Sequence, residues 1–247
     1  MKAIVNIALA AIAASSPLFR ADHNGLEITA QLNSRATGST SKEFTEGGCR
    51  DVIFVFARGS TELGNMVRPA PPPPRLGCFL PLKPPSQGST VGPPTSDGLK
   101  KRYGDDKVAT EGVDYAASLE TNLAPGGADP LAVAEMKRLL NDATEKCPKA
   151  KIVAGGYSQG AAVAHRAIES LSDAVKKRID GVVTYGDTQK AQDKGQIPNF
   201  PKDKVKIICN DSDEVCKGTL EIEPAHLDYV RRVSEGVDFL VGKIGNI

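Results

Sequence analysis

Histidine is scarce in this sequence: only three occur among 247 residues, so a reaction that needs an imidazole has few candidates. The five cysteines include no pair with zinc-site spacing, and no segment repeats, which excludes zinc-finger and repeat architectures. The 31 basic and 30 acidic residues give a formal net charge of +1. Neither a nucleic acid nor an acidic membrane is therefore indicated as a partner. After the first 16 residues, no apolar run is long enough to span a bilayer.

The first 16 residues, MKAIVNIALAAIAASS, have the charged, apolar and small-residue order of a secretory signal peptide. A buried N-terminal helix is the alternative. We expect cleavage between Ala13 and Arg20, a pro-segment or disordered arm over residues 17–48, and a folded domain over 49–247. The protein should then be secreted, without a membrane anchor, into surroundings where disulfides persist.

The rest of the chain alternates between strand patterns and helix patterns. VIFVFA is a continuous apolar run of the kind that forms a strand buried on both faces. The expected strands are 52–57, 107–113, 151–156, 181–186 and 204–209, and the expected helices are 95–104, 129–147, 159–171 and 226–244. This alternation predicts an α/β fold with a mostly parallel central sheet flanked by helices.

The segment GGYSQGA contains the pattern G-x-S-x-G, centred on Ser158. The pattern alone is weak, and a plain Gly-rich turn would also fit it. Its context is stronger, because an apolar strand enters the segment and an Ala-rich helix leaves it, as a nucleophile elbow requires. Ser158 is therefore the expected nucleophile, with the N-terminus of the helix aimed at a developing anion.

A serine nucleophile needs a base, and only one of the three histidines is well placed. His23 lies in the expected pro-segment. His165 follows Ser158 by seven residues on the same expected helix, about 10 Å along its axis, so we expect a surface or helix-packing role for it. His226 remains as the base.

The third member of such a triad is an acid between the serine and the histidine. Asp213 lies in a short loop between Cys209 and Cys216, directly after an expected strand. A disulfide there would hold the loop, and the acid's task is to hold the imidazole in one tautomer. Asp211 competes closely, and spacing alone does not separate the two. Asp187 is more distant in the chain.

An oxyanion hole needs two donors. The backbone N–H of Gln159, next after the nucleophile, supplies one. Ser60, in the turn ARGST after the first strand, can supply both an N–H and a hydroxyl. A cap or turn role is equally compatible with a serine at this position.

Four motifs in order resemble fungal cutinases: CRDVIFVFARGSTELGN, CPKAKIVAGGYSQGAAVA, IPNFPKDKVKIICNDSDEVCKGTL and PAHLDYV. The resemblance covers roughly residues 49–241 and implies a single-domain α/β-hydrolase with an exposed site and no large lid. It implies a Ser158, Asp213 and His226 triad, which favours Asp213 over Asp211. The other roles that it implies are an oxyanion hole of Ser60 and Gln159 supported by Asn122, disulfides Cys49–Cys147 and Cys209–Cys216, and an acyl-binding cleft of Leu119, Leu220, Ile222 and Leu227.

The expected activity is a serine esterase that cleaves cutin and similar aliphatic esters, as a monomer and without a metal or organic cofactor. Glu221 and Glu223 flank Ile222 where the resemblance suggests less charge. An acetylxylan esterase of the same family shape is one alternative. A non-catalytic secreted surface-binding protein is another.

Residues 67–87 interrupt the resemblance with eight prolines and no acidic residue. Cys78, within them, is left without a partner in the two implied disulfides. Joining Met66 directly to Gly88 restores an uninterrupted cutinase-like sequence, and Val-Arg and Gln can be encoded by common intron borders. We interpret the segment as a translated intron. The alternative is a genuine proline-rich surface loop.

Overall fold

The computed structural model describes residues 36–62, 64–66 and 91–247, which belong to one compact unit. Five strands form a single parallel sheet in the order β2-β1-β3-β4-β5. The strands are β1 (Val52–Ala57), β2 (Val108–Gly112), β3 (Lys151–Tyr157), β4 (Ile179–Tyr185) and β5 (Val205–Ile208). The predicted α/β fold is confirmed, with each expected strand present within two residues of its predicted limits.

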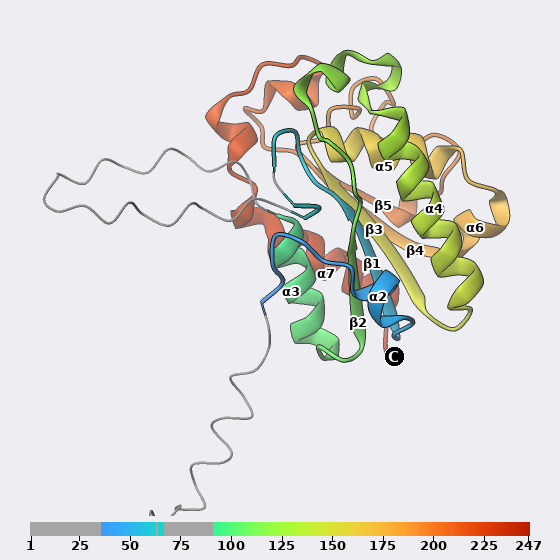
Figure 1. The fold of residues 1–247 in the computed structure, drawn as a ribbon. Helices are drawn as coiled ribbons and strands as arrows, with labels where there is room; N and C mark the ends of the chain where they lie inside the picture. The colour runs from blue at the N-terminus through green and yellow to red at the C-terminus, as the bar shows by residue number, and fades with distance from the viewer. Residues whose placement is uncertain (1–35, 63, 67–90) are drawn as a thin grey trace, which may run out of the picture. The chain divides into compact units, whose positions relative to one another are not determined.

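Helices cover both faces of the sheet (Figure 1). They are α2 (Glu43–Gly47), α3 (Gly92–Tyr103), α4 (Pro130–Lys146), α5 (Gln159–Glu169), α6 (Asp173–Arg178) and α7 (Val233–Ile244). Strand β1 explains the two layers, because its six residues are all fully buried. Ile53 and Val55 face the core under α4, α5 and α6, whereas Phe54 and Phe56 face the core under α3 and α7.

Two helix starts differ from the prediction. Helix α3 begins at Gly92 rather than at Thr95 or Ser96, because prolines suit a first helical turn. Helix α7 begins at Val233, so the helix expected from His226 is wrong over its first seven residues. Short 3₁₀ turns over 224–227 and 230–232 replace them. The side chain of Asn210 donates to the carbonyls of residues 225 and 228, which an α-helix would have used internally.

The expected loose arm does not extend to residue 48, because residues 37–48 pack along the edge of the sheet as a strap. Asn65 accepts a hydrogen bond from the Ser41 N–H and donates to the Ser41 carbonyl. Glu111 of edge strand β2 accepts from the backbone N–H groups of Phe44 and Thr45 at the start of α2. Phe44 is buried in the core. The strap therefore covers β2, whose edge would otherwise be open.

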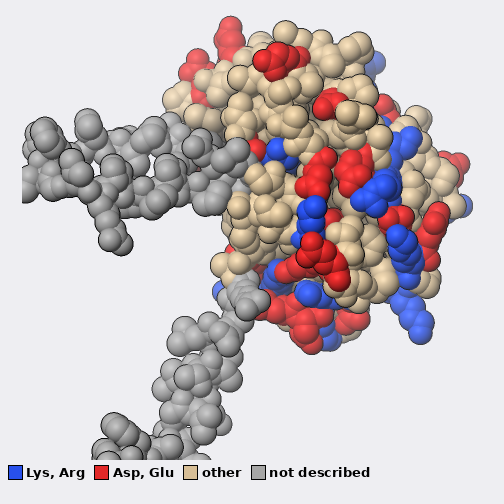
Figure 2. All heavy atoms as spheres, in the orientation of Figure 1, with Lys and Arg blue, Asp and Glu red and all other residues tan. Residues whose placement is uncertain are grey.

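Both implied disulfides are present, Cys49–Cys147 and Cys209–Cys216. No helix in the ranges described is long and apolar enough to cross a membrane. The expected signal peptide, His23 and the segment 67–87 with Cys78 lie outside the described residues. Acidic and basic side chains are interspersed on the face shown in Figure 2, in keeping with the balanced net charge.

Candidate active site

Ser158 occupies a sharp turn between β3 and α5, at the carboxyl edge of the sheet (Figure 1). Its φ of 54° and ψ of −119° form a strained conformation for a residue with a side chain. A Cβ on Gly156 would lie 2.2 Å from the Gly160 carbonyl oxygen, and one on Gly160 would lie 2.0 Å from the Ala57 carbonyl oxygen. Only glycine fits at either position, and this crowded turn has the backbone geometry that a nucleophile elbow requires.

The predicted triad residues lie in one hydrogen-bonded line. Ser158 Oγ is 2.9 Å from His226 Nε2, and His226 Nδ1 is 2.9 Å from Asp213 Oδ2. Asp213 and His226 are buried, and Ser158 is 8% exposed. Asp211, the alternative acid, is exposed. A proton can pass from the serine to an imidazole whose opposite nitrogen is held by a carboxylate.

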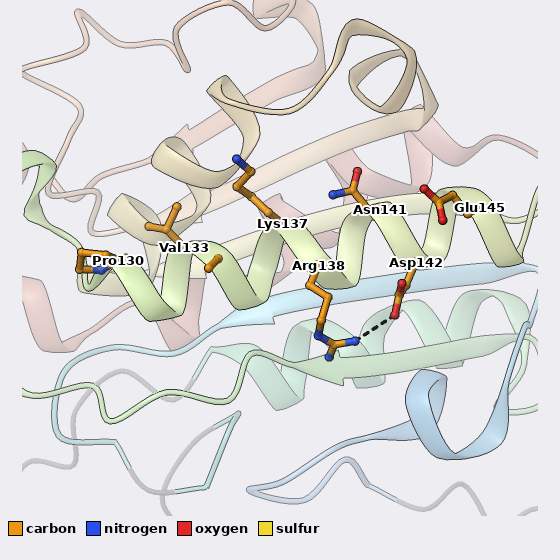
Figure 3. A pocket seen from close by; sticks show the side chains of 8 residues that line it. Pro130, Val133, Lys137, Arg138, Asn141, Asp142 and Glu145 are labelled. Atoms are coloured by element: carbon orange, nitrogen blue, oxygen red, sulfur yellow. Dashed lines mark hydrogen bonds and ion pairs between the residues drawn. The ribbon is translucent and has the colours of Figure 1, made fainter.

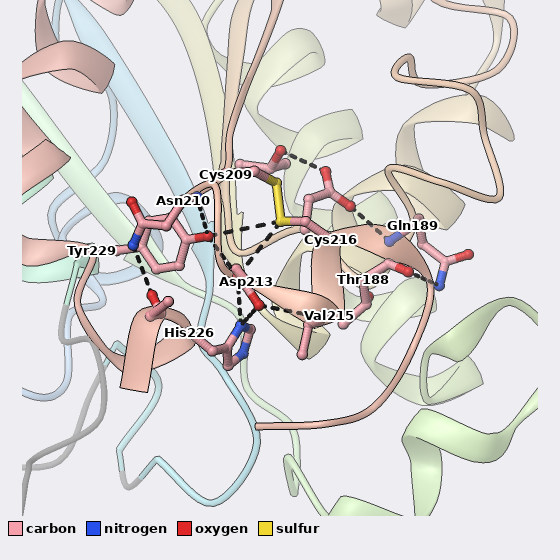
Figure 4. Close-up of a disulfide and its surroundings, with 12 residues drawn as sticks. Thr188, Gln189, Cys209, Asn210, Asp213, Val215, Cys216, His226 and Tyr229 are labelled. Carbon is pink, nitrogen blue, oxygen red and sulfur yellow. Dashed lines mark hydrogen bonds and ion pairs between the residues drawn. A yellow bond between two sulfur atoms is a disulfide. The ribbon is translucent and has the colours of Figure 1, made fainter. Parts of the chain in front are cut away.

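Asp213 is held from several directions (Figure 4). Its carboxylate accepts from the Tyr229 hydroxyl at 2.6 Å and from the Val215 N–H at 3.0 Å. The Cys209–Cys216 disulfide closes the loop that carries it. Burial alone would raise the pKa of Asp213, but the bonds from His226 and Tyr229 hold it below its usual value. The carboxylate therefore stays ionised at neutral pH.

Two tyrosines complete the surroundings of the imidazole. The Tyr157 ring stacks on His226 with 5.4 Å between centroids, and its hydroxyl donates to the His226 carbonyl at 2.9 Å. Tyr229 lies edge-on to the same imidazole. Sequence reasoning missed both, although each lies inside a motif that carried the resemblance, GGYSQGA and PAHLDYV.

The segment 118–122 connects the predicted oxyanion residues. Asn122 donates to Ser60 Oγ at 2.9 Å. The Gln159 side chain donates to the Ser118 carbonyl and to Thr121 Oγ1, at 2.8 Å each. Gln159 is the first residue of α5, so its own N–H has no partner within the helix. The arrangement can offer a backbone donor and a hydroxyl to an oxygen bound near Ser158.

The predicted acyl-binding residues come from two segments of the chain, 119–123 and 220–227. The Leu119 carbonyl accepts from Asn122, which places Leu119 next to the oxyanion loop. Leu220 and Ile222 lie in the loop between Asp213 and His226. The exposed fractions are 60% for Leu119, 48% for Leu220 and 54% for Ile222, while Leu227 is half-buried. Leu123, which the sequence did not single out, is 78% exposed on the Leu119 side.

His165 is buried rather than on the surface, so of its two expected roles helix packing is the one that the structure shows. Its Nε2 is 2.9 Å from Asp187 Oδ2 and its Nδ1 is 2.6 Å from Asp193 Oδ2. Arg166 also pairs with Asp193. Two carboxylates facing both ring nitrogens require both nitrogens to carry protons. Burial alone would lower the pKa of His165, but the carboxylates outweigh it and raise the pKa to about 9.

The pairing of His165 with Asp187 and Asp193 predicts that the protein loses stability at alkaline pH. The pKa of His165 is higher in the folded state than its unperturbed 6.5. Its contribution is therefore complete below pH 6.5 and lost as pH rises through about 9, a change on the order of 3 kcal/mol. Urea unfolding at pH 7 and pH 10 should show this decrease, and a smaller one in His165→Gln. Equal decreases in both proteins would contradict the assignment.

A shallow hollow on the outer face of α4 is a separate feature (Figure 3). Its lining includes Val133, Lys137, Asn141 and the Arg138–Asp142 ion pair, but none of the triad residues. Within the described ranges, no cluster of His, Cys, Asp or Glu could hold a metal ion.

Comparison with known proteins identifies the family. The cutinase family model matches residues 82–244, and cutinase CUT2 of Pyricularia oryzae is 44% identical over 86% of this chain and 90% of its own. The chain belongs to the cutinase family. It is a serine carboxylic ester hydrolase with the α/β-hydrolase fold.

Solved structures agree with this membership. A Trichoderma reesei cutinase, in complex with a phosphonate inhibitor, has a TM-score of 0.67 and 28% identity, and the match covers 90% of this chain and 87% of that one. An acetylxylan esterase has a TM-score of 0.54 at 19% identity, covering 80% of this chain and all of the other. The second likeness shows a shared fold only.

Proposed function

We propose that this member of the cutinase family hydrolyses the ester bonds of cutin and similar aliphatic esters through an acyl-enzyme on Ser158. The observation that carries the proposal is the hydrogen-bonded line from Ser158 through His226 to Asp213. Exposed apolar side chains occur in the loop between Asp213 and His226 and in the segment that bonds to Ser60. The triad provides the reaction, and the apolar groups provide contacts for an aliphatic chain.

His226 Nε2 takes the proton of Ser158 as its oxygen attacks the ester carbonyl, and then gives it to the departing alkoxide. The ionised Asp213 stabilises the imidazolium and keeps Nδ1 protonated. Water, deprotonated by His226, releases the acid from the serine in the second half of the cycle.

The negative charge that develops on the carbonyl oxygen is stabilised by the Gln159 N–H and by Ser60. Asn122 donates to Ser60 Oγ, which leaves the hydroxyl hydrogen free to point at the oxyanion. Such a donor acts most strongly when its position is fixed before the substrate arrives.

The acyl chain of the ester lies along Leu119 and Leu123 on one side, or Leu220 and Ile222 on the other. Burial of each added methylene is worth about 0.8 kcal/mol, so longer chains gain affinity until the apolar surface ends. Glu221 and Glu223, both exposed beside Ile222, weaken adsorption to a uniformly apolar surface.

A series of p-nitrophenyl esters tests this substrate class. We expect kcat/KM for butyrate and hexanoate to exceed that for acetate by about 10-fold or more, because the apolar rim contacts the longer chains. Release of monomers from cutin should exceed release of acetate from acetylated xylan. A preference for acetate and acetylxylan would instead support the acetylxylan esterase alternative. Failure of an organophosphate to label Ser158 would support the non-catalytic one.

The cellular setting forms part of the same proposal. Two disulfides in a chain with a signal-like N-terminus are typical of secreted proteins. We therefore propose that the enzyme acts outside the cell, as a monomer.

A further inference from the structure

Glu62 lies two residues after Ser60, and its side chain folds back to the backbone of Gly59. Its carboxylate accepts a hydrogen bond from the Gly59 N–H at 2.8 Å, and its own N–H donates to the Gly59 carbonyl at 3.4 Å. Two hydrogen bonds therefore join Gly59 to Glu62 and close a turn that contains Ser60. The carboxylate is the one side chain among these four residues that bonds back to the loop's own backbone.

The remainder of the loop is fixed to its surroundings. The Arg58 guanidinium donates to the Glu62 and Tyr115 carbonyls and lies over the Tyr115 ring, 4.6 Å from its centroid. The Tyr115 hydroxyl donates to the Arg58 carbonyl. The Thr61 N–H donates to the Ala117 carbonyl at 2.8 Å. The Tyr115 hydroxyl thus bonds to the carbonyl of the Arg58–Gly59 peptide, and the Glu62 carboxylate bonds to the N–H of that same peptide.

Gly59 is confined between two groups. A Cβ on it would lie 2.7 Å from the Tyr157 ring on one side and 3.5 Å from the Glu62 carboxylate on the other. The Tyr157 ring also stacks on His226, so the same ring forms a wall of both the oxyanion loop and the triad. A shift of Gly59 away from Glu62 would therefore move Ser60 relative to Ser158.

We propose that Glu62 is a positioning residue, which holds the Gly59–Ser60 backbone so that Ser60 is fixed in the oxyanion hole before substrate binds. The proposal rests on the function assigned above to Ser60. An oxyanion donor displaced by about 1 Å can lose much of its effect, because the strength of such a site depends on preorganisation.

The protonation state of Glu62 supports this role. Burial raises the pKa of Glu62 to about 7, although the Gly59 N–H and Arg58 act in the opposite direction. The charged and titratable groups that face it are Arg58 and, from the segment after β2, Tyr115. A carboxylate accepts a stronger hydrogen bond than a neutral carboxyl group. The loop is thus held more firmly above pH 7 than below it.

Two substitutions separate this role from a general effect on folding. Glu62→Ala removes the acceptor, and we expect kcat for p-nitrophenyl butyrate to fall about 10- to 100-fold with KM changed by less than threefold. Glu62→Gln keeps a carbonyl acceptor that does not titrate. At pH 8, kcat of Glu62→Gln should lie within about threefold of the parent value. The ratio of kcat in Glu62→Gln to kcat in the parent should be at least twofold higher at pH 6 than at pH 8, because only the parent's carboxylate is protonated over this range.

Controls make the outcomes distinguishable. Glu145→Ala, an exposed change on α4, should leave kcat unchanged, and Ser60→Ala gives the size of a full loss of the hydroxyl, roughly 10²- to 10³-fold. Parent-like kcat in Glu62→Ala, or a loss confined to KM, would overturn the inference. If Glu62→Ala fails to fold, Glu62→Gln alone decides. A pH profile of its kcat that runs parallel to that of the parent would overturn the inference. If Ser60→Ala is also fully active, it is the assigned oxyanion role that fails.

Discussion

Replacing Ser158 by alanine is expected to lower the hydrolysis of p-nitrophenyl butyrate by about 10⁶-fold. The oxygen that His226 deprotonates is lost, so no acyl-enzyme can form, and only the weak effect of binding and of the oxyanion hole remains. Alanine adds no bulk at the elbow, where φ is 54°, so the fold should persist. Initial rates with purified protein, together with circular dichroism, measure both effects.

Ser170→Ala is the matched control for this change. Ser170 is exposed at the carboxyl end of α5, and its hydroxyl donates to the backbone carbonyls of residues 166 and 167. Its substitution should leave the rate within about twofold of the parent. Turnover of more than one per cent in Ser158→Ala would show that another nucleophile carries the reaction.

Asp213→Asn is expected to lower kcat by about 10⁴-fold while the protein remains folded. An amide in place of the carboxylate no longer stabilises the imidazolium, and its NH₂ group favours the wrong tautomer of His226. The Tyr229 hydroxyl, 2.6 Å from the carboxylate, also loses a charged acceptor. Steady-state kinetics on butyrate esters, with the unfolding temperature as a check on folding, measure this prediction.

Asp211→Asn provides a control within the same loop. Asp211 is exposed and is separated from Asp213 by one residue, so it experiences the same change of charge without contact with His226. Its kcat should stay close to that of the parent. Equal losses from the two substitutions would show that the negative charge of the loop matters, rather than the bond to the imidazole.

The sequence predicted the sheet and the sharp turn at Ser158 well, because both follow from local patterns. Strand β1 is a continuous apolar run rich in β-branched and aromatic residues, which favours a strand buried on both faces. The glycines around Ser158 mark positions where a Cβ would collide with backbone. Such signals lie within a few residues of the feature that they specify.

The features that were missed depend on partners distant in the sequence. His165 is paired with Asp187 and Asp193, 22 and 28 residues away, and nothing in its helix indicates those partners. The late start of α7 follows from bonds that Asn210 makes across the site. The strap over 37–48 has no hydrophobic period, because polar contacts to Asn65 and Glu111 hold it.

The position of β1 between β2 and β3 has a consequence for biosynthesis. This strand is made first, yet its two neighbours, β2 and β3, leave the ribosome only after about 50 and 95 further residues. The Cys49–Cys147 bond spans a sequence separation of 98, so it too must wait for most of the chain. β3 ends at Tyr157, one residue before Ser158. A nascent chain therefore cannot complete the pairing of β1 until it has also made the strand that leads into Ser158.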